Sequence, residues 1–187
     1  MTTRASSSSW DAGVTWVSPE VVNWFARRRI AISLIGFTSL VVFNILIVRT
    51  VPYNPLHITQ TPVAVALLCL LIGLGIRSWS AGTLNKSREL TTCGPYALVR
   101  NPLYVGSFLM MFGFCLLCRD WPTLLFVAGP MSALYWLQVR FEERRLSQLF
   151  PEQWPGYVRS VPRFIPTRWQ PTVIGGWTVR EWLRNRE

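Results

Sequence analysis

Residues 30–48 read IAISLIGFTSLVVFNILIV, an uncharged stretch in which Asn44 is the one strongly polar member. At about 1.5 Å of rise per residue, a helix of this length nearly covers a hydrocarbon core of roughly 30 Å. Residues 121–139 are uncharged as well, and Gly129-Pro130 within them predicts a kink. These two stretches indicate a protein that crosses a membrane.

Two shorter apolar stretches lie between them. Residues 102–118 carry no charge, and residues 63–76 form a run that by length alone could be a buried core helix. The latter extends past Arg77 if that side chain snorkels towards the headgroups, because the small and aromatic residues after it suit an interface. We therefore expect an all-α membrane protein with about four transmembrane helices.

Composition and charge agree with this expectation. Half of the 187 residues are hydrophobic and 15% are charged, whereas a soluble domain carries about a quarter charged residues. All the lysines and arginines except Arg49 and Arg119 precede the first span, separate the second from the third, or follow the fourth. The positive-inside rule then places both termini and the middle loop in the cytoplasm. Topology and anionic lipid headgroups thus explain the net charge of +10 without a nucleic-acid partner.

The segments outside the spans are short. Residues 1–29 are expected to form a cytoplasmic tail with an interfacial helix that starts at Ser18-Pro19-Glu20, and the position of the basic cluster argues against a secretory signal. Residues 30–187 would form a single membrane domain that ends in cytoplasmic helices. Because no outside segment has the usual size of a domain, any active site must be assembled from loops and helix ends.

Three kinds of residue that often form cofactor, metal or thiol sites lie here in places that do not favour such sites. Gly73-Leu-Gly75 lies inside a span, which favours helix packing over dinucleotide binding. The single histidine, His57, has no second ligand near it, so no metal site is expected. Cys115 and Cys118 lie in an apolar helix, where packing is the ordinary role, while Cys93 in the middle loop could be packed or reactive.

Two cytoplasmic segments carry polar groups in unusual positions. The first descends into the third span, with a Gly94-Pro95 turn, a polar pair at headgroup level and a helix-starting proline; it reads GPYALVRNPLYVG over residues 94–106. The second, Glu142-Glu143, follows the fourth span on an otherwise basic face. The two glutamates either pair with Arg140, Arg144 or Arg145 in a solvated network or bind a ligand that is cationic or rich in hydroxyls.

Together these segments resemble the membrane methyltransferases related to isoprenylcysteine carboxyl methyltransferase, a group that includes phospholipid N-methyltransferases. The resemblance rests on Gly-Pro-Tyr-x-x-Val-Arg-Asn-Pro-x-Tyr-x-Gly followed by Glu-Glu-x-x-Leu. Phe150, Tyr157 and the run from Val161 to Pro166 are similar to the carboxy-terminal pattern of bacterial members. The resemblance covers roughly residues 62–166.

The resemblance implies S-adenosylmethionine bound on the cytosolic side and a methyl group transferred to a lipophilic acceptor, such as an isoprenylcysteine-type carboxylate or a related lipid. A carboxylate can balance the sulfonium or hold ribose hydroxyls, tyrosine rings can stack, and an arginine can take the methionyl carboxylate. Arg140 would position an anionic acceptor. The implied cofactor-binding residues are Tyr96, Arg100, Asn101, Pro102, Tyr104, Glu142 and Glu143.

One position departs from the family pattern, which usually has Arg-His-Pro where this chain has Arg100-Asn101-Pro102. Asparagine keeps a donor and an acceptor but cannot act as a titrating base. An acceptor that is already anionic would need no base. The alternatives are a nicotinamide-dependent membrane reductase of related fold, a catalytically inactive scaffold, or a small-molecule transporter or channel. None of the expected spans carries a charged residue in its interior, which transport sites often need.

Overall fold

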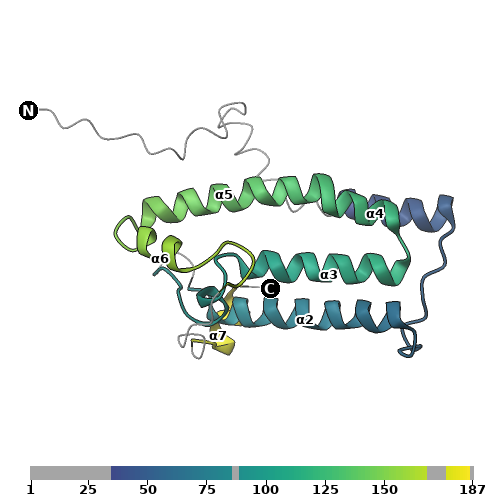
Figure 1. Ribbon diagram of the computed structural model, residues 1–187, viewed down its shortest axis with the longest axis horizontal. Coiled ribbons are helices and arrows are strands. Elements are labelled where there is room, and N and C mark those ends of the chain that lie inside the picture. Colours follow the sequence, from purple (N-terminus) through teal and green to yellow (C-terminus); the bar gives the residue numbers. More distant parts are fainter. Residues whose placement is uncertain (1–34, 86–88, 168–175, 186–187) are drawn as a thin grey trace, which may run out of the picture.

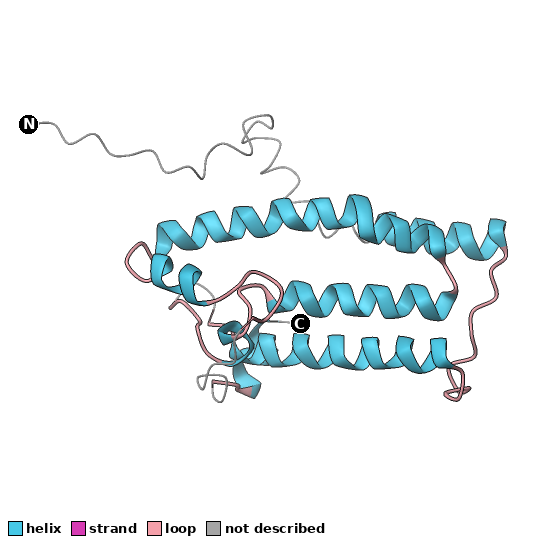
Figure 2. Ribbon diagram, in the orientation of Figure 1, coloured by secondary structure: helices cyan, strands magenta, loops and turns pink. Residues whose placement is uncertain are grey.

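The computed structural model describes residues 35–85, 89–167 and 176–185, and these residues form helices and loops without a strand. The expected interfacial helix and the first residues of the first span lie outside the described residues. Figure 2 shows the helical architecture. The all-helical prediction is therefore confirmed for the part of the chain that the structure covers, and the count of four spans stays a prediction.

The helices follow one another in the order shown in Figure 1. An apolar helix, Ile35–Val48, ends in the π-helical turn η1 (Asn44–Val48). The remaining elements are α2 (Thr61–Thr83), the 3-10 turn η2 (Gly94–Ala97), α3 (Pro102–Cys118), α4 (Trp121–Phe126), the π-helical turn η3 (Val127–Met131), α5 (Ser132–Leu149), α6 (Trp154–Ser160) and α7 (Val179–Asn185).

Two described helical runs are long and apolar enough to cross a membrane, namely α2 and the continuous run Trp121–Leu149. Ile35–Val48 and Pro102–Cys118 are apolar but shorter. The end of the molecule where α2 ends and α3 begins is called the motif end below. The opposite end, where α3 gives way to α4, is called the far end.

The hairpin of α2 and α3 is packed through glycines, and the two helices lie side by side in Figure 1. A Cβ on Gly73 would lie 2.7 Å from the Gly106 carbonyl oxygen, and one on Gly113 would lie 2.6 Å from the Ala66 carbonyl oxygen. The backbones can approach this closely because no side chain separates them. The packing role predicted for the glycines of span two thus holds for Gly73, whereas Gly75 faces open space.

A buried polar cluster at the far end connects the first helix to α4. Asp120 is the N-cap of α4 and accepts a hydrogen bond from the Thr123 amide at 2.8 Å. The Asn44 side-chain amide donates to the same carboxylate at 2.6 Å, across 76 residues of sequence. All three side chains are at least 97% buried, so this cluster fixes the helix Ile35–Val48 against α4.

The expected kink near Gly129-Pro130 takes the form of the π-helical turn η3, which contains both residues. Proline has no amide hydrogen to donate, and a wider turn accommodates its ring within an otherwise continuous helix. The helix resumes as α5 and continues to Leu149, so it carries the glutamate pair to the motif end.

The carboxy-terminal arm, residues 176–185, covers the end of α2. The Thr178 amide donates to the Gly82 carbonyl oxygen at 2.9 Å. The Asn185 side-chain amide donates to the Ala81 and Leu84 carbonyl oxygens at 2.7 and 2.9 Å. These bonds satisfy carbonyl groups that the last turn of a helix otherwise leaves without an internal partner.

Candidate functional site

The loop into α3 is shaped by one left-handed glycine. Gly94 has φ of +59°, and a Cβ there would lie 2.9 Å from Thr83 Cγ2. Glycine is the residue that adopts this conformation without strain. The chain then makes the turn η2, and Pro102 begins α3 at its first position. Asn101 precedes it as the N-cap, but its side chain does not cap the helix and is directed elsewhere.

The glutamate pair lies near the end of α5. Consecutive residues on a helix point about 100° apart, so Glu142 and Glu143 meet different neighbours. Glu143 is 8% exposed, and Glu142 is half-buried. The two carboxylates therefore have separate environments.

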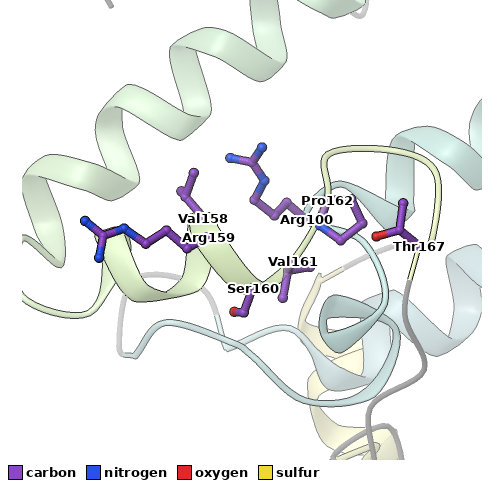
Figure 3. A pocket seen from close by; sticks show the side chains of 7 residues that line it. All are labelled: Arg100, Val158, Arg159, Ser160, Val161, Pro162 and Thr167. Carbon is purple, nitrogen blue, oxygen red and sulfur yellow. The ribbon is translucent and has the colours of Figure 1, made fainter. Parts of the chain in front are cut away.

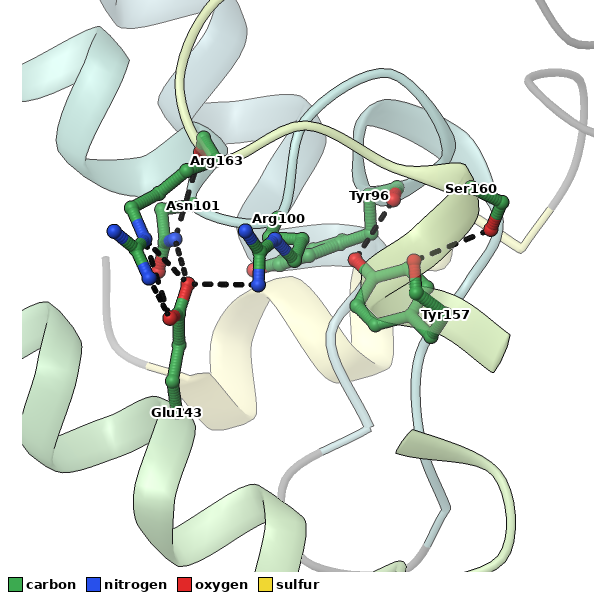
Figure 4. Close-up of polar contacts among 7 residues, drawn as sticks. All are labelled: Tyr96, Arg100, Asn101, Glu143, Tyr157, Ser160 and Arg163. Atoms are coloured by element: carbon green, nitrogen blue, oxygen red, sulfur yellow. Dashed lines mark hydrogen bonds and ion pairs between the residues drawn. The ribbon is translucent and has the colours of Figure 1, made fainter. Parts of the chain in front are cut away.

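Glu143 joins three segments of the chain, as Figure 4 shows. Arg163 donates to it twice, from Nη2 to Oε2 at 2.7 Å and from Nε to Oε1 at 3.1 Å. Arg100 Nη1 lies 3.4 Å from Oε1, and Asn101 Nδ2 donates to the same oxygen at 3.1 Å. For Glu143, the alternative of a solvated network with its neighbours on α5 is wrong, because it is buried and its arginine partners come from elsewhere in the chain.

Glu142 faces α3 instead. The Tyr104 hydroxyl and the Gln138 side-chain amide each donate to Glu142 Oε1 at 2.9 Å. The ring of Tyr104 meets that of Tyr135 edge to face, with centroids 5.4 Å apart. Glu142 thus lies at the polar end of an aromatic contact between α3 and α5.

Residues 157–163, here called the clasp, hold the loop into α3 from outside. The Tyr157 hydroxyl donates to the Tyr96 carbonyl oxygen at 2.8 Å, and the Arg100 amide donates to the Pro162 carbonyl oxygen at 2.9 Å. Burial raises the pKa of the Tyr157 hydroxyl, so it remains a donor at all physiological pH values. The clasp thereby fixes the loop that carries Arg100 and Asn101.

A pocket of about 200 Å³ opens beside Arg100, and Figure 3 shows its lining residues. Its walls are Arg100, Val158, Arg159, Ser160, Val161, Pro162 and Thr167. The Nε of Arg100 is buried and has no hydrogen-bond partner among the residues that the structure describes. Burial lowers the pKa of the Arg100 guanidinium and Glu143 raises it, yet an arginine stays charged in such a setting. An anionic group in this pocket would therefore be attracted by the positive charge of Arg100.

The structure brings most of the predicted site residues together. Arg100, Asn101 and Glu143 form one cluster, and Tyr104 and Glu142 form an adjacent one. Pro102 is buried at the start of α3, and Tyr96 is 7% exposed behind the clasp. Arg140 is half-buried on α5 and makes no ion pair within the described residues.

Two residues of the site escaped the sequence reasoning. Gln138 is a polar residue near the end of the uncharged run 121–139, and its position one helical turn before Glu142 is the available signal. Arg163 was part of a recognised carboxy-terminal pattern, but nothing in that pattern pointed to Glu143 as its partner.

The chain is similar in sequence to known proteins. The phospholipid methyltransferase family model matches residues 63–153. The chain is 30% identical over 146 residues to the nickel-cobalt-cadmium resistance protein NccN of Alcaligenes xylosoxydans xylosoxydans. This alignment covers 77% of this chain and 67% of NccN. It is 28% identical over 186 residues to the cobalt-zinc-cadmium resistance protein CzcN of Cupriavidus metallidurans, and this alignment covers 96% of this chain and 81% of CzcN.

A third relative is an enzyme by name. The chain is 31% identical over 86 residues to a protein-S-isoprenylcysteine O-methyltransferase of Schizosaccharomyces pombe, which covers 46% of this chain and 36% of that protein. No solved structure matches the chain significantly.

Proposed function

Because the chain belongs to the membrane methyltransferase family that includes phospholipid and isoprenylcysteine methyltransferases, we propose that it transfers a methyl group from S-adenosylmethionine to a lipophilic acceptor. The acceptor would reach the site from the bilayer, and the cofactor would enter from the cytoplasm. The matched region contains the loop into α3 and the glutamate pair, so the family likeness and the polar clusters coincide.

One observation carries the proposal: the Arg100 side chain, which is 11% exposed, lines a pocket beside the loop into α3. The guanidinium is positively charged, so it would attract a methionyl carboxylate bound in this pocket. The pocket volume of about 200 Å³ is below the roughly 300 Å³ of the smallest small-molecule sites, so it suits one end of a cofactor. Asn101, Pro102, Tyr104, Glu142 and Glu143 would hold the remainder, and buried Tyr96 would support the loop.

S-adenosylmethionine, when bound, supplies a methyl group on a positively charged sulfur. Within the chain, Glu142 places a carboxylate where positive charge is favoured, oriented by Tyr104 and Gln138. Asn101 holds Glu143 without exchanging a proton. The chain thus contributes positioning and exclusion of water, which suits an acceptor that is already anionic.

The proposal includes the topology. We place four spans in the membrane with both termini and the motif end in the cytoplasm, and we take residues 30–187 as one domain behind an amino-terminal tail. Reporter fusions after Glu20, at Lys86 and after Arg168 should read cytoplasmic, whereas fusions at Pro55 and Arg119 should not. A cytoplasmic signal from Pro55 would overturn the four-span arrangement.

Calorimetry of the purified protein tests the cofactor. We expect S-adenosylhomocysteine to bind and NADPH not to bind. Glu142→Ala should weaken the binding at least tenfold, because losing a hydrogen bond to a charged group costs roughly 1.5–3 kcal/mol. Arg145→Ala, an exposed change on the same helix, is the matched control and should bind as the wild type does.

The other outcomes of that experiment point to the rival functions. Binding of NADPH in place of the methyl-donor product would favour a reductase. Binding of neither ligand would favour a scaffold. Binding that is unaffected by Glu142→Ala would remove this carboxylate from the proposed site.

The names of two relatives suggest a physiological setting. We infer that methyl transfer by this chain supports cells exposed to nickel, cobalt, zinc or cadmium. A deletion strain should grow more poorly in these metals, and the wild-type chain should restore growth while Glu142→Ala should not. Equal rescue by both would separate metal resistance from the proposed chemistry.

A further inference from the structure

Arg77 is a charged residue inside a helix that can span a membrane. It lies in the last third of α2, where its neighbours towards the far end are apolar. A charged side chain at such a position is costly in a bilayer, and residues of this kind mark functional sites more often than surface arginines do. The expectation from the sequence was that Arg77 snorkels towards the headgroups.

In the structure, the Arg77 side chain lies against α3. A Cβ on Gly106 would lie 2.8 Å from Arg77 Cγ, so the stem of the arginine lies directly against this glycine. Beyond the glycine, Arg77 Nη1 donates to the Ser107 hydroxyl. Ser107 in turn donates to the Leu103 carbonyl oxygen at 2.9 Å, which fixes the acceptor. The contact with Gly106 and the hydrogen bond to Ser107 therefore place the guanidinium on the flank of α3.

That flank adjoins the proposed active site. Ser107 follows Tyr104 by three residues, and residues three or four apart on a helix are neighbours. Tyr104 contacts Glu142, and both Tyr104 and Phe108 meet the ring of Tyr135. The Arg77 guanidinium thus binds one turn further into the bundle than the Tyr104–Glu142 contact, about 4.5 Å along the helix axis.

We propose that Arg77 binds the anionic headgroup of the lipid acceptor, a carboxylate or phosphate, and so selects anionic over neutral acceptors. This inference rests on the proposed methyl transfer. The depth of the residue favours the acceptor over the cofactor, because a lipid brings its headgroup from the bilayer side whereas Arg100 borders the pocket in the loop outside the helices. A guanidinium forms strong, directional hydrogen bonds with either kind of anion.

A matched pair of amphiphiles tests this. The full chain in a nonionic detergent would be titrated with 1-oleoyl-lysophosphatidate and with 1-monooleoylglycerol, which share a chain and differ by the phosphate, and bound lipid would be counted by native mass spectrometry. The wild type should prefer the phosphate by about tenfold or more. Arg77→Gln should lose this preference while S-adenosylhomocysteine affinity stays within about twofold. Arg145→Gln, the same charge change at an exposed position, should keep both.

A second variant covers a folding failure of Arg77→Gln. Ser107→Ala keeps the charge but removes its tether, and it should reduce the preference severalfold. An unchanged preference in Arg77→Gln overturns the inference, and so does a loss of S-adenosylhomocysteine affinity that matches the loss of preference, because Arg77 would then serve the cofactor. A wild type that binds no S-adenosylhomocysteine but keeps an Arg77-dependent lipid preference would refute the methyl transfer alone.

Discussion

Replacing Glu143 by alanine should destabilise the protein strongly, because this residue joins three segments at the motif end. The substitution removes the carboxylate that Arg163 contacts at 2.7 Å and Arg100 at 3.4 Å, and it leaves the Asn101 amide without this acceptor. Removing one member of a buried ion pair costs about 3–5 kcal/mol. Because the Arg163 side chain is 30% exposed and can be hydrated, we take the lower end of that range.

A loss of about 3 kcal/mol corresponds to a Tm lower by about 6–12 °C for a chain of this size. Thermal unfolding of the purified protein in one detergent measures it. Glu152→Ala, an exposed acid beyond α5, serves as the control and should unfold with the wild type.

A double-mutant cycle isolates the pair itself. In an Arg163→Ala background, Glu143→Ala should cost at least about 1 kcal/mol less than it does alone, because one of the stranded charges is gone. A Tm of Glu143→Ala within about 2 °C of the wild type would refute the reasoning, since removing a buried carboxylate that has three partners should cost more than that.

Three further changes test other parts of the structure. Tyr157→Phe should cost about 1 kcal/mol of stability at pH 8. Because burial raises the pKa of Tyr157 above its ordinary 10.0, the hydroxyl stabilises the fold below pH 10 and does so less and less above it, so the Tm values of wild type and variant should converge towards pH 11. Equal Tm values already at pH 8 would show that the hydroxyl is unimportant. Arg49→Gly should raise stability by about 1 kcal/mol, because Arg49 is held at φ of 54° where glycine is unstrained, and a lower Tm would reveal a contact that outweighs the strain. Asn101→His should retain S-adenosylhomocysteine binding and introduce an inflection near pH ~6.5 in methyl transfer, whereas the wild type should show none from this position; a wild-type rate that already changes sharply there would point to another titrating group.

Much of the helical framework could be predicted from uncharged runs. The run at residues 102–118 coincides with α3, because a proline opens it and Arg119, in a left-handed conformation, closes it. Span four was expected to end at Val139 but α5 continues to Leu149, since the residues that follow are strong helix formers and Pro151 is the first to interrupt them. Apolar runs therefore locate a span well but do not show how far its helix extends into water.

The site was predictable in its members but not in its pairings. Arg100, Asn101 and Glu143 were expected at one place because the family resemblance assigns all three to one cofactor site. Arg163 is one of nine arginines after span four, and no periodicity in an irregular segment distinguishes it from the others. The contact of Asn44 with Asp120 was equally hidden, because residues 76 positions apart meet only when the helices are packed.

The clasp and the carboxy-terminal arm also bear on how the protein is made. The hairpin of α2 and α3 needs only nearby residues, so it can form as soon as both helices have been synthesised. The bond from Tyr157 to the Tyr96 carbonyl oxygen spans 61 residues, and that from Asn185 to Ala81 spans 104. The described helices up to α5 have therefore all been synthesised before the loop bearing Arg100 is fixed in place. Immature chains in which these bonds have not yet formed would contain the packed helices but would not bind a ligand.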